Sequence, residues 1–175
     1  MTAPILIAYA TRGGSTGEVA EAIGASLRDA GLMLDVLPVG KVATLEGRTA
    51  VILGAPLYIG RFPDDFHKFL ARHRAALTTL RPWCFVLGPT RTEPADFEAA
   101  RNQATKQFDQ YPWLHLVDTR ILGGRWDMKH LPFPFSLVRR IPFFPVNRIP
   151  QADIRDWAAI REWARGIARE IKPAA

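Results

Sequence analysis

The feature that most constrains the fold is a series of short, almost wholly apolar segments separated by amphipathic ones. The first, at residues 5–10, reads Ile-Leu-Ile-Ala-Tyr-Ala and is followed by a cluster of glycine and hydroxyl residues. Apolar runs this short, without alternating polar positions, are typical of strands buried on both faces of a sheet. The same reasoning predicts further strands at residues 32–39, 49–55, 82–87 and 114–122.

Apolar residues at helical spacing lie between these strands. They predict helices at residues 15–30, 62–76, 94–111 and 153–171, and a weaker pattern at 41–48 favours a short helix there. We expect Asp153 to cap the last helix, because aspartate is a favoured N-cap residue. Alternating strands and helices imply a parallel sheet with helices on both faces. The length suits one domain, residues 1–175.

The segment that follows the first strand has the composition of an anion cradle. It reads Thr11-Arg12-Gly13-Gly14-Ser15-Thr16-Gly17 and leads directly into a predicted helix. Glycines let the backbone curl closely around a ligand, and a helix N-terminus presents free N–H groups and about half a positive charge. The hydroxyls of Thr11, Ser15 and Thr16 can add hydrogen bonds to phosphate. A plain turn that caps the helix is the alternative, and the spacing matches neither the dinucleotide fingerprint nor the P-loop.

The same residues resemble the FMN phosphate signature of the flavodoxin family. The matching pattern is Tyr9-x-Thr11-x-x-Gly14-x-Thr16-x-x-x-Ala20-x-x-Ile23, and Ala8 departs from it, since the family usually has a larger apolar residue there. The resemblance implies a flavodoxin-like doubly wound sheet of five parallel strands, in the order 2-1-3-4-5, with helices on both faces. It also implies FMN as cofactor, with its phosphate on Thr11, Arg12, Gly13, Gly14, Ser15 and Thr16.

Two later loops fall where this family holds the flavin ring. The loop after the third strand, Gly54 to Gly60, resembles the family loop that packs on one ring face, which assigns Pro56, Leu57, Tyr58, Ile59 and Gly60. Tyr58 can stack on the ring, or it is an ordinary surface tyrosine. The loop after the fourth strand matches the second ring-binding loop in place and assigns Gly88, Pro89, Thr90 and Arg91. Arg91 can equally be a solvated charge.

The whole chain is similar to a flavodoxin subgroup typified by menaquinone-dependent protoporphyrinogen oxidase. The shared features are the glycine-bounded loop after the third strand, a basic aromatic insert, and Asp156-Trp157 at the start of the last helix. The resemblance implies an FMN-dependent oxidoreductase that passes electrons between an organic substrate, such as a porphyrinogen, and a quinone. A flavodoxin-type electron carrier is the alternative, although the net charge of +6 does not suit its usual acidic docking surface.

The excess positive charge is concentrated before the last helix. Residues 120–148 contain six basic residues and one acidic residue, and the insert at about 124–151 is also rich in proline and phenylalanine. Residues 129–148 are suited to an anionic membrane surface, to a pocket for a quinone or porphyrin, or to packing over the edge of the sheet. Regular structure is not expected there. Nucleic-acid binding is not predicted, since no recognition module is present.

Other classes of site have little support. Cys84 lies in an apolar run, which predicts a buried structural thiol, and His67, His73, His115 and His130 lack the spacing of a metal site. We therefore expect no metal and no catalytic side chain, because the flavin itself would carry the redox chemistry. The N-terminus lacks a signal peptide's basic region. We expect a cytoplasmic protein, which would contact the inner face of the membrane if the insert binds lipid; the sequence does not predict an oligomeric state.

Overall fold

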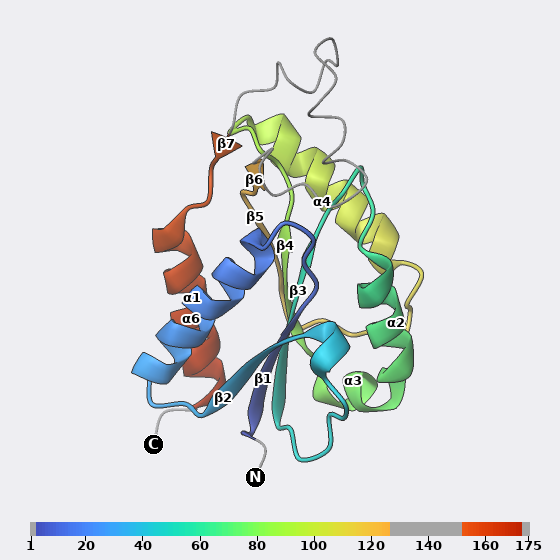
Figure 1. Ribbon diagram of the computed structural model, residues 1–175, viewed down its shortest axis with the longest axis vertical. Coiled ribbons are helices and arrows are strands. Elements are labelled where there is room, and N and C mark those ends of the chain that lie inside the picture. The colour runs from blue at the N-terminus through green and yellow to red at the C-terminus, as the bar shows by residue number, and fades with distance from the viewer. Residues whose placement is uncertain (1–2, 127–151, 173–175) are drawn as a thin grey trace.

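The computed structural model describes residues 3–126 and 152–172, which form a parallel five-stranded sheet with a small antiparallel pair beside it (Figure 1). The strand order is β2-β1-β3-β4-β5, which confirms the predicted doubly wound sheet. Its strands are β1 Ile5–Tyr9, β2 Leu34–Pro38, β3 Ala50–Pro56, β4 Trp83–Leu87 and β5 Thr119–Leu122. The central strand β3 is buried along its whole length, because helices cover both faces of the sheet.

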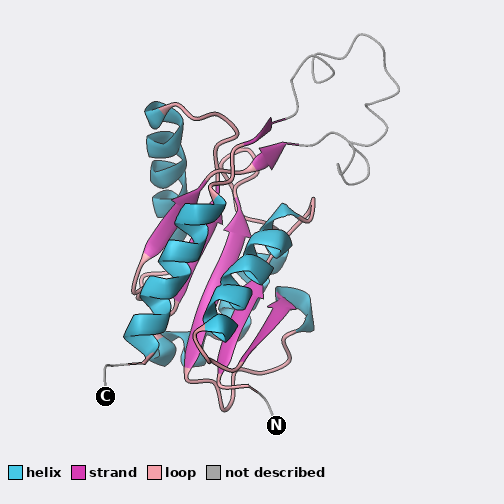
Figure 2. Ribbon diagram, turned by 90° about the vertical axis from the view of Figure 1, so that its left-hand side faces the viewer, coloured by secondary structure: helices cyan, strands magenta, loops and turns pink. Residues whose placement is uncertain are grey.

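The helices divide into two layers (Figures 1 and 2). Helices α1, Ser15–Asp29, and α6, Trp157–Ile171, cover one face, while α2, Asp64–Arg72, α3, Arg74–Leu80, and α4, Pro94–Phe108, cover the other. Each layer buries its own apolar core against alternate residues of the strands, so that Ile7 faces α1 while Ala8 faces the opposite layer. No helix in the described residues is long and apolar enough to cross a membrane.

The prediction of a short helix at residues 41–48 is wrong. Only a single 3-10 turn, η1 at Val39–Lys41, precedes an irregular segment. The backbone N–H of Glu46 donates to the Thr44 hydroxyl at 3.0 Å, and Gly47 has a positive φ of 76°. A hydrogen bond between a side chain and the backbone two residues further on competes with the hydrogen bonds of a helix. The segment is instead anchored by Arg48, whose buried guanidinium donates to Asp35 at 2.6 Å.

Three other predicted elements differ in their bounds. The helix expected over 62–76 is divided into α2 and α3 at His73, and the helix expected over 94–111 ends at Phe108. The strand expected over 114–122 is regular only from Thr119. Leu114 and Leu116 pack against the core from a loop, which accounts for their apolar character without a strand.

The last helix begins at Trp157, and its cap is Asp156, not the predicted Asp153. The Asp156 carboxylate accepts a hydrogen bond from the N–H of Ala159 at 2.9 Å. Asp153 belongs to β7, Ala152–Asp153, which pairs antiparallel with β6, Arg125–Trp126. This unpredicted pair flanks residues 127–151 in the sequence, and these residues, with the whole of the proposed membrane-binding segment 129–148, lie outside the described residues. The single domain over 1–175 stays a prediction.

The buried His73 makes stability depend on pH. Its side chain lies at the junction of α2 and α3, and its Nε2 has no hydrogen-bond partner among the described residues. Burial lowers the pKa of His73, and the neighbouring Arg72 charge lowers it further. The unfolded chain therefore binds the proton more readily than the folded one. The stability that neutral His73 contributes is fully present above its ordinary pKa, about 6.5. It is lost as the pH falls from there through the lowered pKa of the folded state.

We therefore expect His73→Gln to flatten the acid side of the stability profile. Urea unfolding at about pH 7.5 and about pH 5.5 should show a smaller loss of free energy for the variant than for the wild type. The exposed His115 is the matched control, and His115→Gln should follow the wild type. An equal loss in all three proteins would exclude His73 as the titrating group.

Candidate functional site

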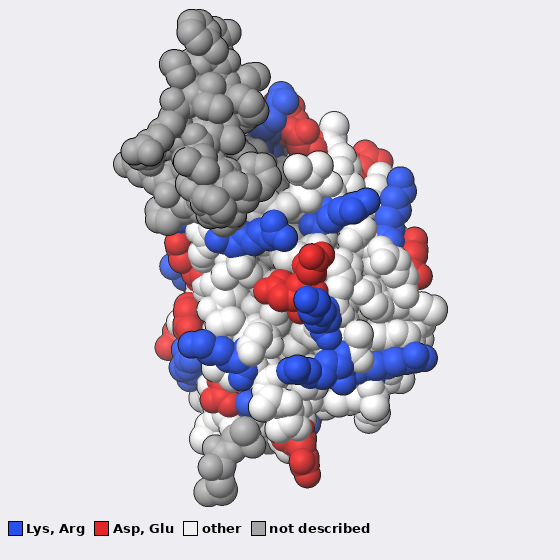
Figure 3. All heavy atoms as spheres, turned by 45° about the vertical axis from the view of Figure 1, so that its right-hand side comes forward, with Lys and Arg blue, Asp and Glu red and all other residues white. Residues whose placement is uncertain are grey.

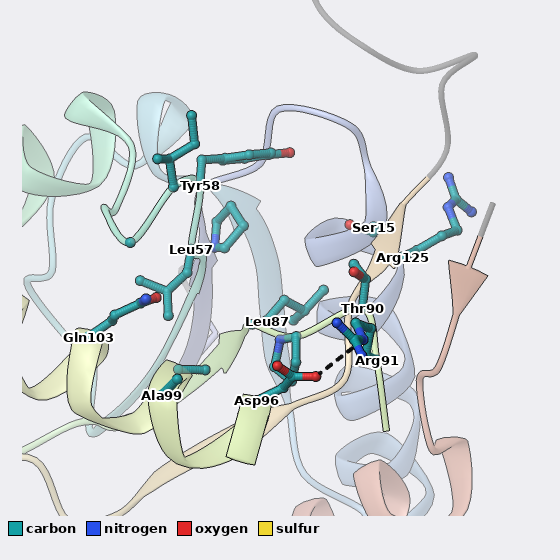
Figure 4. Close-up of a pocket in the computed structure, with 17 residues that line it drawn as sticks. Ser15, Leu57, Tyr58, Leu87, Thr90, Arg91, Asp96, Ala99, Gln103 and Arg125 are labelled. Atoms are coloured by element: carbon teal, nitrogen blue, oxygen red, sulfur yellow. Dashed lines mark ion pairs between the residues drawn. The ribbon is translucent and has the colours of Figure 1, made fainter. Parts of the chain in front are cut away.

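A groove of about 540 Å³ opens at the carboxyl ends of the central strands, the edge at which doubly wound sheets bind ligands. Its walls are formed by the start of α1, the loops after β3, β4 and β5, and helix α4 (Figure 4). Its size is within the range of small-molecule sites. The lining residues are Ser15, Pro56, Leu57, Tyr58, Ile59, Gly60, Leu87, Gly88, Pro89, Thr90, Arg91, Asp96, Ala99, Ala100, Gln103, Gly124 and Arg125.

The structure brings most of the predicted site residues together here. Every predicted residue of the two ring-binding loops lines the groove, and Ser15 joins them from the first loop. The other five predicted residues, Thr11, Arg12, Gly13, Gly14 and Thr16, are not part of the lining. They lie in the same first loop, immediately beside Ser15, at the start of α1.

The first loop has the geometry of an anion cradle. Gly14 precedes α1 with a left-handed φ of 84°, and its N–H donates to the Thr11 hydroxyl at 2.9 Å. Ser15 and Thr16 are both buried, and no side chain caps the helix. The Thr16 Oγ1 atom makes no hydrogen bond with any described residue. A buried hydroxyl without a partner costs free energy, and a phosphate oxygen held by the helix N-terminus is a suitable partner for it.

The second loop is shaped by a tight turn. Tyr58 and Arg61 exchange two backbone hydrogen bonds, Tyr58 N to Arg61 O at 2.9 Å and Arg61 N to Tyr58 O at 3.0 Å. Between them, Ile59 and Gly60 have positive φ angles of 49° and 74°, as in the two-residue turns of hairpins. Such a φ is costly for a β-branched residue, and Ile59 is 98% exposed. The turn therefore presents Tyr58 and Ile59 at the rim of the groove.

Tyr58 also connects the second loop to the first. The Arg12 guanidinium carbon lies 5.7 Å from the centre of the Tyr58 ring, which is a cation–π distance. Burial raises the pKa of the Tyr58 hydroxyl, while the Gly13 backbone and the Arg12 charge partly offset this effect. Tyr58 therefore remains a neutral phenol at neutral pH. The Tyr58 ring can line an aromatic ligand, while the Arg12 guanidinium lies over the ring.

The third loop is joined to helix α4 by an ion pair. The Arg91 Nε lies 3.6 Å from Asp96 Oδ2, and both side chains line the groove (Figure 4). The Asp96 Oδ2 atom accepts no hydrogen bond in the described part of the chain. Gly88 is required for the close approach of this loop to α4, because a Cβ there would lie 2.8 Å from the Ala100 Cβ.

Sequence reasoning missed seven lining residues, and four of them had a readable signal. Asp96, Ala99, Ala100 and Gln103 lie along one face of α4, at the spacing i, i+3, i+4 and i+7. Two alanines at that spacing leave room for a ligand. Leu87 is the last residue of β4. Gly124 and Arg125 had no such signal, because their position depends on how β5 and β6 end beside the groove.

Other candidate chemistry is not found in the described residues. Cys84 is fully buried, as predicted, and burial raises the pKa of its thiol, which makes it unreactive. No group of three His, Cys, Asp or Glu side chains in residues 3–126 and 152–172 is arranged to hold a metal ion.

Charged residues are spread over the face of the molecule drawn in Figure 3. Lys and Arg side chains lie across it with Asp and Glu side chains between them, so that no single-sign patch dominates that view. The basic residues Lys129, Arg139, Arg140 and Arg148, which carry much of the positive charge before the last helix, lie outside the described residues.

Comparisons with known proteins agree with this geometry. A family model for the flavodoxin domain matches residues 6–135. The chain is 21% identical over 172 residues to protoporphyrinogen IX dehydrogenase [quinone] of Escherichia coli (strain K12), with 93% of each chain covered. It is 24% identical over 170 residues to the protein of that name from Leishmania major. That alignment covers 93% of this chain and 74% of the Leishmania protein. The crystal structure of oxidised Flavodoxin 1 from Bacillus cereus is similar in fold, with a TM-score of 0.59, 16% identity, and 96% and 99% of the two chains covered.

Proposed function

We propose that this chain, which belongs to the flavodoxin domain family, binds FMN in the groove at the carboxyl edge of its sheet. The phosphate would be held by Thr11, Arg12, Gly13, Gly14, Ser15 and Thr16. The flavin ring would lie between the loop of residues 56–60 and the loop of residues 88–91. The observation that carries this proposal is the buried Thr16 hydroxyl, which lacks a partner at the start of α1.

The donor set suits FMN better than an uncharged flavin. A phosphate dianion would receive hydrogen bonds from the Ser15 and Thr16 hydroxyls and from the N–H groups at the N-terminus of α1. The groove beyond Ser15 is walled by Pro56, Leu57 and Leu87. These apolar side chains would exclude water from the ring, while Tyr58 would cover it from the rim. The residues present therefore fit a ligand with one doubly charged end and one flat apolar end.

We further propose that the protein is an FMN-dependent oxidoreductase that transfers electrons between an organic substrate and a quinone. FMN, when bound, would accept and release the electrons. The chain's own side chains would bind and orient it and shield it from water. The support for this reaction class is the 21% and 24% identity to proteins named protoporphyrinogen IX dehydrogenase [quinone]. A porphyrinogen is therefore the substrate class to test first.

A titration of the purified apoprotein with FMN and with riboflavin tests the cofactor proposal. We expect FMN to bind with quenching of its fluorescence, and riboflavin, which lacks the phosphate, to bind at least about tenfold more weakly. Equal affinity for the two flavins would contradict the phosphate cradle. Failure of FMN to bind would exclude the flavin proposal as a whole.

The same loaded protein tests the reaction class. After anaerobic photoreduction, the absorbance of the oxidised flavin should return on addition of a menaquinone analogue. If quinones leave it reduced while a redox partner protein reoxidises it, the electron-carrier alternative replaces the oxidoreductase proposal.

A further inference from the structure

Four charged side chains form a cluster behind one wall of the groove. This ionic cluster consists of Glu18, Arg125, Asp153 and Arg155. Arg125 Nη1 donates to both carboxylate oxygens of Glu18, at 3.0 and 3.2 Å. Arg155 donates to Glu18 Oε2 at 2.6 Å, and to Asp153 Oδ1 and Oδ2 at 2.8 and 2.5 Å. Glu18 is thus shared by two arginines that follow it by 107 and 137 residues.

Arg155 is the buried member of the ionic cluster. Its side chain is 4% exposed, and its guanidinium carbon lies 4.6 Å from the centre of the Trp157 ring. Its hydrogen bonds hold the pKa of the Asp153 carboxyl below the usual range. A buried cation is tolerated only when it is paired. Two carboxylates and two guanidinium groups compensate one another here, so removing the Glu18 carboxylate takes from Arg125 its partner in the cluster.

The ionic cluster joins the first turn of α1 to the groove wall. Glu18 lies in that first turn, two residues after Thr16. Arg125 and Gly124 line the groove, and in Figure 4 the Arg125 guanidinium points away from the cavity, toward the outside. Gly124 also donates to Pro89 O at 2.7 Å and accepts from Ile154 N at 3.2 Å. The wall residues 124–125 are therefore held between α1, the loop after β4 and the segment after β7.

We propose that Glu18 is a positioning residue for FMN. Its carboxylate would hold Arg125, and through Arg125 the wall formed by Gly124 and Arg125, at a fixed distance from the phosphate cradle. This inference rests on the proposed binding of FMN in the groove. It assigns to Glu18 a role that its own charge does not predict, because a carboxylate two residues from the cradle repels a phosphate dianion.

That repulsion gives the test a definite sign. If Glu18 acted only as a charge near the phosphate, its neutralisation would strengthen the binding of FMN and leave riboflavin unaffected. If Glu18 positions the wall, its neutralisation weakens the binding of both flavins. The two roles predict opposite changes in the dissociation constant for FMN.

The experiment compares Glu18→Gln with Glu21→Gln in the full-length apoprotein. Glu21 lies on the same helix, one turn on, and its side chain is 60% exposed and 3.7 Å from Arg28. We expect Glu18→Gln to weaken the binding of FMN and of riboflavin by about tenfold each, since hydrogen bonds between charged groups are the stronger ones. Glu21→Gln should leave both dissociation constants unchanged.

Variants of Arg125 separate positioning from a general loss of stability. Arg125→Gln should weaken flavin binding in the same direction as Glu18→Gln, and the double variant should lose less affinity than the sum of the two single losses, because both changes remove the Glu18–Arg125 interaction. Arg125→Lys keeps the cation and should recover part of the lost affinity. Circular dichroism and urea unfolding confirm that each apoprotein is folded when its affinity is measured.

The possible results distinguish a wrong positioning role for Glu18 from a wrong proposal that the protein binds FMN. If the wild type binds FMN while Glu18→Gln binds it equally or more tightly, the positioning role is wrong and the proposed function stands. The same holds if Glu18→Gln lowers only the midpoint of unfolding. If the wild type itself does not bind FMN, the proposed function is wrong, and the inference is overturned with it.

Discussion

Gly54→Ala is expected to lower the free energy of unfolding by about 3 kcal/mol, the upper end of the usual cost of overpacking a core. Gly54 is the residue of β3 paired with Phe85 of β4. A Cβ at Gly54 would lie 2.2 Å from Cζ of Phe85 and 2.6 Å from Cε1. The Phe85 ring is fully buried, and it cannot move aside without disturbing the core beneath α1 and α6.

Urea unfolding of the apoprotein measures this effect. Gly40→Ala is the matched control, because a Cβ at Gly40 meets no described atom within 4 Å. It should change the free energy of unfolding by less than about 1 kcal/mol. The double variant Gly54→Ala, Phe85→Leu should recover part of the loss, since the smaller side chain leaves room for the methyl group. If Gly54→Ala is as stable as the wild type, the close approach of β3 and the Phe85 ring is wrong.

Thr16→Val is expected to weaken FMN binding by between about tenfold and a hundredfold, the range for a lost hydrogen bond to a charged group. The same change should leave the apoprotein at least as stable as the wild type. The Thr16 hydroxyl is buried and makes no hydrogen bond with a described residue, and valine removes this unpaired group at nearly constant volume. Stability and ligand affinity should therefore change in opposite directions.

Fluorescence titration and urea unfolding check the two parts of this prediction. Thr105→Val serves as the control, because its exposed hydroxyl donates to the Arg101 carbonyl on α4, away from the first loop. It should alter neither the affinity for FMN nor that for riboflavin. If Thr16→Val binds FMN as tightly as the wild type, the Thr16 hydroxyl is not a phosphate ligand. If the variant apoprotein is markedly less stable, the hydroxyl has a partner within the fold.

The loops that form the groove could be predicted because their signals are local. A buried strand followed by Gly, Ser and Thr residues and then a helix predicts a phosphate cradle within one stretch of chain. The loops after β3 and β4 are placed by the strand order, since parallel strands end at the same edge. All nine predicted residues of those two loops line the groove.

The errors occurred where packing against the core or a side-chain contact overrides the periodic pattern. Leu114 and Leu116 are apolar, yet they pack on the core from a loop and not from a strand. Asp153 has the sequence signature of a helix cap, but its carboxylate binds Arg155 and leaves the capping role to Asp156. His73 divides a continuous helical pattern into α2 and α3.

The sequence by itself determined the alternation of buried strands and amphipathic helices and the composition of the three loops, because periodicity and turn chemistry act over a few residues, while the strand order followed from the resemblance to the flavodoxin family. Only the tertiary structure decided the wall of the groove and the ionic cluster behind it. Glu18 and Arg155 are separated by 137 residues, and nothing in either segment alone indicates that they meet. Pairing between such distant charges depends on burial and on the geometry of the finished fold, and these exist only after the sheet and both helical layers are assembled.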